Sequence, residues 1–434
     1  MERAGGFGSL ALLSQFARRL RRSTLAANTF WLYCIAFSNY LLPLATIPYL
    51  ARVLGPAVLG VVVSSQSLAA WLTLAVEYGF SFTATREIAC ARNDKDKLAQ
   101  IAGAIMVLQL LIAVAASLIA VGVAAVVPIF RGRSVCVLAA WFLGVFQGLN
   151  PFWYFQGIER LRTATLVNAL SRAVGYGSML LLVHTPAHAS RVLLLQAGSA
   201  GFACLVNMFM VRRELELRQP LFSDLRRTAS RGLAVFLSNS AASLYSVFGI
   251  LLLATLVSPY TVGVYGGAER IHRAVLSLFT PICQALYPRV SLLASSDVSL
   301  AAHTARRAMA LMLSLGIALA LGVIFLAPVL VSYGLGPKYE AAKGILRILA
   351  FQYPITALSR VLGTQWLLPL RHDRAFLTVV VTAGLTNVLL ILSLVPRFGA
   401  SGMAASFVTT ELLVLAGLAA VVSMKTPLWR LKHA

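Results

Sequence analysis

Three ionisable side chains interrupt residues 263–288, "GVYGGAERIHRAVLSLFTPICQALYP", a segment otherwise long and apolar enough to cross a bilayer. Glu269, Arg270 and Arg273 lie about a third of the way along it. One charged side chain at the centre of a lipid-facing helix costs roughly 2.5–3.5 kcal/mol. Three would together cost about as much as the stability of a whole domain. We therefore expect them to face water or one another.

A helical wheel places these charges on one face of the segment. At about 100° per residue, the polar side chains gather in an arc about 100° wide, and large apolar side chains cover the opposite face. We expect this polar stripe to line a water-filled cavity through the depth of the membrane. The stripe holds Gly266, Glu269, Arg270, Arg273, Ser277, Thr280 and Gln284.

The spacing of the charges suggests different roles for the two arginines. Glu269 and Arg273 are four residues apart and can pair along a helix. Such a pair could serve only to fix the helix, but it leaves Arg270 without a partner in its own span. A guanidinium offers a planar fork of donors that matches phosphate oxygens and stays charged at any working pH. We therefore expect Arg270 and Arg273 to bind an anionic, phosphate-bearing ligand.

Other spans carry polar residues on one face in the same way. Asn168 and Arg172 share an arc of the span at 163–183, and Arg360 shares one with polar residues of the span at 343–369. The resulting excess of positive charge favours an anion in the cavity. Arg52, at the outer end of the first span, could equally be an interface anchor or part of the cavity rim.

Glu411 is an isolated acid at mid-depth in the last apolar run, with no basic residue nearby in sequence. A carboxylate buried without a partner tends to hold a proton near neutral pH, which would suit a proton-coupling site. A hydrogen-bonded structural acid is the alternative.

The composition of the chain places these residues in a polytopic membrane protein. Of its 434 residues, 59% are hydrophobic and 12% are charged, against about 25% charged in soluble domains. The apolar runs do not alternate as barrel strands do, so we expect an all-α fold with twelve transmembrane helices. Their approximate ranges are 28–51, 57–80, 99–128, 134–156, 163–183, 191–211, 232–257, 262–288, 306–332, 343–369, 374–395 and 399–424.

The distribution of basic residues predicts the orientation. The formal net charge is +23, and most of the 37 Lys and Arg residues fall in segments on the side of the N-terminal tail. By the positive-inside rule, both termini should be cytoplasmic. Residues 1–27 are predicted to form a basic amphipathic segment on the inner surface. We attribute the basic charge to topology and anionic lipid, and expect no nucleic acid as a partner.

Two halves of six spans flank a basic linker at 212–231. The predicted lobes are 28–211 and 232–424, followed by a cytoplasmic tail at 425–434. Related Pro-x-x-x-Gly-Val sequences begin at Pro56 and Pro259, near the end of the first span of each half. With six spans each, the halves would be pseudo-repeats in the same orientation, forming two lobes around a central cavity. Transporters built this way bind substrate between the lobes.

Several motifs are absent from the sequence. There is no GxxxxGK[ST] phosphate-binding loop, so the chain should not hydrolyse ATP. The five cysteines are scattered, and Pro186 disrupts the pair His184 and His188, so no metal site is expected. The sequence also lacks a long outer loop, which disfavours a glycosyltransferase or ligase. We expect no catalytic residues.

The sequence also resembles a known family, the polysaccharide flippases (Wzx type) of the multidrug/oligosaccharidyl-lipid/polysaccharide exporter superfamily. The resemblance extends from Asn28 to about Met424. It rests on "NTFWLYCIAFSNYLLPLATIPYLARVLGP", "EYGFSFTATREIA", "NPFWYFQGIERLRTATLVN", "GVYGGAERIHRAVLSLFTPICQALYPRVSLL" and "RFGASGMAASFVTTE".

This resemblance implies transfer of an undecaprenyl-diphosphate-linked oligosaccharide between leaflets of a bacterial inner membrane, for O-antigen or exopolysaccharide synthesis. It implies two lobes that open the cavity alternately to either side of the membrane, with Arg270 and Arg273 binding the diphosphate. A proton or sodium gradient could drive transfer, and a polysaccharide polymerase is a possible partner; no cofactor is expected. A multidrug or ion antiporter of the same superfamily is the alternative. It would favour cationic drugs and acidic cavity residues, which the arginine excess opposes.

Overall fold

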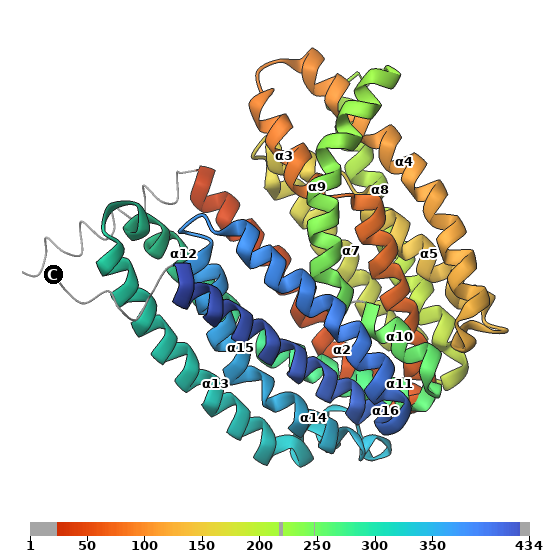
Figure 1. Cartoon of the computed structure of the whole chain (residues 1–434). Helices are drawn as coiled ribbons and strands as arrows, with labels where there is room; N and C mark the ends of the chain where they lie inside the picture. The colour runs from red at the N-terminus through yellow and green to blue at the C-terminus, as the bar shows by residue number, and fades with distance from the viewer. Residues whose placement is uncertain (1–23, 217–219, 247, 426–434) are drawn as a thin grey trace, which may run out of the picture.

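The computed structural model describes residues 24–216, 220–246 and 248–425. Most of the predicted amphipathic segment 1–27, and all but the first residue of the predicted tail 425–434, lie outside these ranges. Within them, every regular element is a helix, which confirms the all-α prediction (Figure 1).

The first half contains one kinked helix, several straight ones and two short 3₁₀ turns at Pro128–Phe130 (η1) and Pro186–His188 (η2). Its α-helices are α2 (Thr24–Glu77), α3 (Phe80–Cys90), α4 (Lys95–Val126), α5 (Ser134–Leu149), α6 (Phe152–Gly157), α7 (Leu161–Leu182) and α8 (Ala189–Glu214).

The second half has a similar series, with a 3₁₀ turn at Pro337–Tyr339 (η3) and a π-helical segment at Val361–Leu367 (η4). Its α-helices are α9 (Phe222–Ser246), α10 (Phe248–Leu256), α11 (Pro259–Leu276), α12 (Phe279–Ser296), α13 (Val298–Gly334), α14 (Ala342–Ala350), α15 (Gln352–Arg360) and α16 (Asp373–Lys425).

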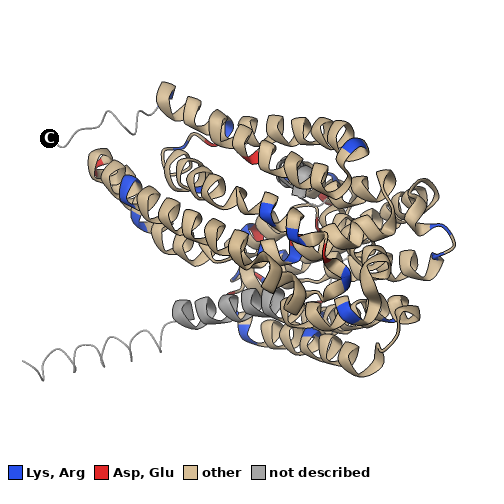
Figure 2. Cartoon of the chain, turned by 90° about the horizontal axis from the view of Figure 1, so that it is seen from below, with Lys and Arg blue, Asp and Glu red and all other residues tan. Residues whose placement is uncertain are grey.

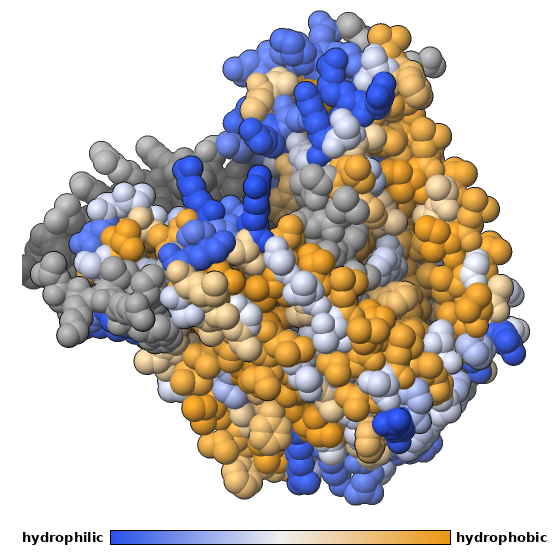
Figure 3. Space-filling view, in the orientation of Figure 1, coloured by the Kyte–Doolittle hydropathy of each residue, from blue (hydrophilic) through white to orange (hydrophobic). Residues whose placement is uncertain are grey.

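Helix length and apolar composition agree with a membrane protein. Seven helical stretches among the described residues are long and apolar enough to cross a bilayer. Two of them span kinks at Gly55 in α2 and Gly399 in α16 and so each take in two predicted spans. In Figure 3 the sides of the molecule are mostly hydrophobic, and hydrophilic side chains gather at its two ends. The count of twelve spans is consistent with this arrangement and stays a prediction.

Two predicted boundaries differ from the structure. The span expected at 262–288 is two helices, because the chain turns at Ser277 and Leu278 between α11 and α12. The basic linker expected at 212–231 is shorter, because α8 continues to Glu214 and α9 already begins at Phe222.

The helices form two arms that meet at one end and diverge toward the other (Figure 1). One arm, the N-terminal arm, holds α3 to α8 and the part of α2 after Gly55, and the other, the C-terminal arm, holds α11 to α16. The diverging end carries the helix termini with basic residues such as Arg92, Lys95 and Arg212, and we call it the basic end. Helix α9 connects the arms. It packs against α16, while its middle turns contact the N-terminal arm through Arg231–Glu87 (2.8 Å) and stacking of Phe236 on Tyr78.

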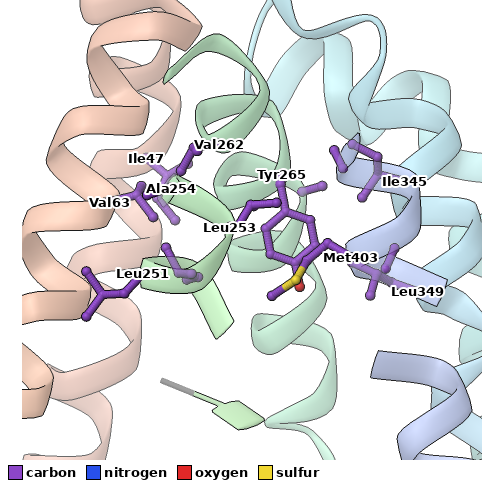
Figure 4. Packing of buried hydrophobic residues seen from close by; sticks show 14 of the residues in the cluster. Ile47, Val63, Leu251, Leu253, Ala254, Val262, Tyr265, Ile345, Leu349 and Met403 are labelled. Carbon is purple, nitrogen blue, oxygen red and sulfur yellow. The ribbon is translucent and has the colours of Figure 1, made fainter. Parts of the chain in front are cut away.

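Apolar packing holds the arms together where they meet. Figure 4 shows Tyr265 of α11 among Ile345 and Leu349 of α14 and Met403 of α16. Tyr265 is 1% exposed, and all four side chains belong to one buried cluster that extends into α2. Helix α11 is therefore the central element of the junction, with α2 on one side and α14 and α16 on the other.

The repeated Pro-x-x-x-Gly sequences make the closest contact of this junction. A Cβ atom on Gly60 would lie 2.0 Å from the carbonyl oxygen of Pro259, and one on Gly263 would lie 1.8 Å from the carbonyl oxygen of Pro56. The contact is reciprocal, so the two related segments cross with their backbones touching. Small residues permit such close helix approach in membranes.

Replacing Gly263 by alanine should destabilise the folded protein at the crossing of α2 and α11. The new methyl group would overlap the carbonyl oxygen of Pro56, which belongs to the backbone and cannot move aside. We expect a loss of about 1–3 kcal/mol in the free energy of unfolding, measured by thermal or denaturant unfolding in detergent. Gly122→Ala in α4 is the matched control, because a Cβ there meets no atom within 4 Å. Equal stability of the two variants would contradict the crossing.

Candidate functional site

The candidate site lies on the polar face of α11 and α12, at the junction of the arms. Most charged residues lie at helix ends, but Figure 2 shows several blue and red positions in the middle of the bundle. The three charges predicted on this face, Glu269, Arg270 and Arg273, all lie on α11. The predicted stripe thus falls between the N-terminal and C-terminal arms.

Exposure along the stripe changes from one end to the other. Gly266 is buried, and a Cβ there would lie 2.8 Å from the Val63 side chain of α2. Glu269 is also buried, Arg270 is half-buried, and Arg273 is exposed. The stripe is therefore covered by α2 near the junction and uncovered toward the basic end.

The remaining stripe residues lie on the uncovered part. Ser277 and Thr280 are half-buried, and Gln284 is exposed. The Ser277 hydroxyl donates to the Ala274 carbonyl of its own helix (2.7 Å), so its polar group is satisfied without a ligand. The structure thus puts the three predicted residues on an open face, of which only the part near Arg273 is strongly charged.

Glu269 and Arg273 form the predicted ion pair. The Glu269 side chain is 10% exposed and the Arg273 side chain 51%. The acid is thus held inside while the guanidinium extends outward. The pair therefore extends from the buried part of the site to its exposed part.

Arg270 has a partner that lies in the other arm. Its guanidinium donates to the side-chain oxygen of Gln66 on α2, and the Gln66 amide donates to the oxygen of Gln196 on α8 (3.0 Å). The expectation that Arg270 lacks a partner within its own span is correct, but a glutamine across the junction supplies one. Arg270 therefore connects both arms of the protein.

Arg172 lies near Arg270 on the N-terminal side. Both interact electrostatically with Tyr176, one turn along α7 from Arg172. Arg172 and Tyr176 are each half-buried. The structure thus brings Arg172, Arg270 and Arg273 from α7 and α11 into one region, as the sequence predicted, with Glu269 as the acid paired there.

Arg360 belongs to a different group of residues, inside the C-terminal arm. Its guanidinium lies 6.0 Å from the centre of the Phe279 ring and within electrostatic range of Glu411. Glu411 is buried close to Gln352, Thr356 and Ser359 of α15. Glu411 has no basic residue nearby in sequence, but in the folded chain it does have a basic neighbour. Helix α15 brings Arg360, which is distant in sequence, close to it.

Arg52 lies outside the candidate site. It donates to the backbone oxygen of Tyr333 at the end of α13 (2.6 Å), and the Tyr339 hydroxyl donates to the oxygen of Ala51 (3.2 Å). Both bonds join α2 to the C-terminal half at the end opposite the basic end. Arg52 therefore links two helices at this end, a contact that the sequence did not predict.

Asn168 takes part in a network inside the N-terminal arm. Its oxygen accepts from the amides of Asn150 (3.0 Å) and Asn207 (3.3 Å), and Asn207 also donates to Asn150 (3.0 Å). These bonds join the end of α5 to α7 and α8. Asn168 is half-buried and its polar group is engaged, so it supports helix packing beside the site.

Sequence reasoning missed the two glutamines and one histidine that complete the site. Gln66 and Gln196 each lie within an apolar span, a position that costs free energy unless the amide is bonded. This signal was available in the sequence, but the pairing across three helices was not. His272, on the opposite face of the wheel, bonds Gln352 (3.0 Å) and stacks on Tyr353.

Comparison with known proteins gives matches over most of the chain. The model of a family described as "Polysaccharide biosynthesis protein" matches residues 25–294. A "Putative O-antigen transporter" from Escherichia coli (strain K12) is 31% identical over 90% of this chain and 95% of its own length. A protein of the same description from Shigella dysenteriae is 25% identical, over 89% and 97%.

Two solved structures share the fold at low sequence identity. The lipid II flippase MurJ in an inward closed conformation has a TM-score of 0.70 at 12% identity, covering 92% of this chain and 88% of that one. An inward-facing multidrug resistance transporter of the MATE family and MOP superfamily has a TM-score of 0.65 at 16% identity, covering 88% and 96%.

A double-mutant cycle with Glu269→Gln and Arg273→Gln should give a coupling of about 1 kcal/mol in the free energy of unfolding. The value should be modest because Arg273 is half exposed and solvent screens the pair. Thermal unfolding in detergent measures it. The same cycle on the exposed pair Arg92 and Glu159 should give less, and a larger value there would contradict a special role for the pair on α11.

Proposed function

The chain belongs to the polysaccharide biosynthesis protein family, and on that premise we propose that it is a flippase of the MOP superfamily. Its substrate is an undecaprenyl-diphosphate-linked oligosaccharide repeat unit, moved across a bacterial inner membrane by alternating access. The product serves O-antigen or exopolysaccharide synthesis. The chain is a transporter and not an enzyme, in keeping with the relatives named as O-antigen transporters.

The observation that carries the proposal is the cluster of three arginines at the junction of the arms. Arg172, Arg270 and Arg273 converge there with Glu269 as the one acid among the site residues described above. A net positive site inside a membrane protein needs an anion to offset its charge. A diphosphate carries two negative charges and several acceptor oxygens, which suits a site of guanidinium forks.

Binding of the diphosphate exchanges one partner of Arg270 for another. The Gln66 amide is a neutral acceptor, and a phosphate oxygen is a charged one that forms a stronger bond. We infer that the headgroup takes Arg270 from Gln66 and so removes a hydrogen bond that joins the arms. Substrate binding would then loosen the junction beside the Gly60–Gly263 contact.

The divergence of the arms gives the substrate a route to the site. The stripe is exposed from Arg273 to Gln284, toward the basic end, and the glycan can occupy this side while the prenyl chain stays in lipid. The positive-inside rule supports placing the basic end and both termini in the cytoplasm. Cooperation with a polysaccharide polymerase, and coupling to a proton or sodium gradient, belong to the same proposal.

The competing functions find less support in the site. A multidrug exporter of the superfamily would take cationic drugs, but the residues gathered here are mainly arginines. The likeness to the MATE transporter, at 16% identity, concerns the fold. A membrane glycosyltransferase or ligase would need a carboxylate base beside its substrate, and Glu269 is engaged by Arg273.

Replacing both Arg270 and Arg273 by alanine should weaken binding of a diphosphate lipid by at least about a hundredfold. Each lost hydrogen bond to a charged group costs roughly 1.5 kcal/mol or more of binding free energy, and about 1.4 kcal/mol corresponds to a tenfold change in affinity. Two such losses therefore give about a hundredfold. In cells, surface polysaccharide should fall and lipid-linked repeat units accumulate. Arg347→Ala is the control, because this arginine is exposed and bonds the Ile324 carbonyl (3.4 Å). Normal export by the double variant would refute the cationic site.

Replacing Gln66 by glutamate should also weaken diphosphate binding, by about tenfold or more. The side chains are nearly isosteric, but the carboxylate would hold Arg270 as a permanent internal anion. Gln66→Leu should bind the diphosphate lipid at least as well as the native protein, because it leaves Arg270 without a competitor. Binding to purified protein in lipid nanodiscs measures both. Equal effects of the two variants would indicate a structural role only.

A further inference from the structure

A second polar group is buried in the C-terminal arm, away from the three arginines of the junction. Glu411 of α16 is 8% exposed, and Gln352, Thr356 and Ser359 of α15, which lie next to it, are 6–7% exposed. The buried hydroxyls of Thr356 and Ser359 make no hydrogen bond of normal geometry within the described chain. This group, which we call the Glu411 cluster, is therefore polar and enclosed, and Glu411 is the acid that these hydroxyls face.

Charged and titratable groups near the Glu411 cluster come from two neighbouring helices. On α15 they are Arg360, within electrostatic range of Glu411, and Tyr353. On α11 they are Glu269 and Arg273, which pair with each other, and His272, which bonds Gln352 (3.0 Å). Two other elements packed on α16, α10 and η4, carry no titratable side chain among their described residues. Helix α14, also packed on α16, carries Lys343, which pairs with Glu340, and Arg347, which bonds the Ile324 carbonyl. The first half of α9 carries the charged residues Asp224, Arg226, Arg227 and Arg231.

Two features of this arrangement favour a proton over a metal ion as the ligand of Glu411. The Arg360 guanidinium already supplies a positive charge beside the carboxylate, and a second fixed cation would repel it. The hydroxyls of Thr356 and Ser359 can donate to an ionised carboxylate or accept from a protonated one. The same residues can therefore accommodate both protonation states without moving far.

We propose that Glu411 is a proton-binding site linked to anion binding through Arg360. When Glu411 is ionised, it is the counter-ion of Arg360 and holds this arginine inside the C-terminal arm. When a proton neutralises Glu411, Arg360 is left without its anion and becomes available to the negative headgroup of the substrate. The proton passes between solvent and the carboxylate, and no other bond is made or broken.

The position of Arg360 makes this exchange possible. Its guanidinium lies above the ring of Phe279, at the first turn of α12, and its side chain is half-buried. Thr280, the next residue, is on the polar stripe. Arg360 is thus half-buried against α12, the helix that also carries Thr280 and Gln284 of the open face. Glu411, by contrast, is enclosed, so this one arginine can serve either anion.

Linkage fixes the sign of the effect. An anion that draws Arg360 away removes the counter-ion of Glu411, so the complex holds the proton more tightly than the free protein does. By reciprocity, lowering the pH must then strengthen anion binding. Proton and substrate bind together in this scheme, and neither displaces the other. The inference rests on the proposed function, because it takes the anion to be the substrate's diphosphate.

The test measures binding of farnesyl diphosphoryl N-acetylglucosamine to the full chain in nanodiscs between about pH 8 and about pH 5.5. This disubstituted diphosphate keeps the same charge throughout, so any pH dependence belongs to the protein. The native protein should bind about tenfold more tightly at the lower pH, within the usual range of coupling between sites. Glu411→Gln, which mimics the protonated acid, should bind tightly at both values.

Two further variants separate Glu411 from its neighbours. His272→Gln keeps a polar partner for Gln352 and should retain the pH dependence. Arg360→Gln should bind weakly and without pH dependence, although the junction arginines still hold the ligand. Thermal unfolding confirms that each variant is folded.

The outcomes that overturn the proposal are distinct from those that overturn the function. Native protein that binds equally at both pH values, or Glu411→Gln that keeps the native pH dependence, refutes the proton site and leaves the flippase proposal standing. Loss of the pH dependence in His272→Gln alone assigns the proton to the histidine and refutes the role of Glu411. Failure of the native protein to bind the lipid at any pH contradicts the proposed function and the inference with it.

Discussion

A guanidinium needs a partner to remain inside a membrane, and the interior of this protein is organised around four such groups. Arg273 is held by an acid one turn away, Arg270 by a glutamine in the opposite arm, and Arg360 faces a buried glutamate from another helix. Arg172 lies beside Tyr176. Because removing any of these partners would leave a charge poorly compensated at membrane depth, the partners also determine how α2, α7, α11, α15 and α16 can pack.

Backbone contact and charge compensation occur side by side on α11. At its first turns, Gly263 and Gly266 let α2 approach closely. From Glu269 onward the helix carries charged side chains, and its polar face becomes exposed by Arg273. A single helix thus changes from a packed surface to a binding surface along its length, and the order of glycine and charge in "GVYGGAERIHR" determines where that change occurs.

Local patterns in the sequence were sufficient for part of this arrangement. The helical wheel placed Glu269, Arg270 and Arg273 on one face, and four-residue spacing predicted their ion pair, because both depend on one helix only. The related sequences at Pro56 and Pro259 indicated a repeat, but nothing local shows that the two copies touch each other. Gln66, Gln196 and Arg360 find partners more than forty residues away, and such pairings depend on helix packing that a wheel cannot describe. The Arg52 bond to a backbone oxygen was beyond prediction for the same reason.

The position of α9 restricts how the two arms can move. The arms touch at the glycine crossing and again, at the basic end, where the middle turns of α9 contact the N-terminal arm. Two bodies that touch at two separate places can keep both contacts only if they rotate about the line through these two contacts. In this protein that line runs along the length of the molecule. A rocking motion must break one contact. The Arg231–Glu87 pair, in which Arg231 is 55% exposed, is worth at most about 1 kcal/mol, so the stacking of Phe236 on Tyr78 has to hold most of the contact at α9. In the alternating motion that we propose, release of this contact would leave the glycine crossing as the pivot.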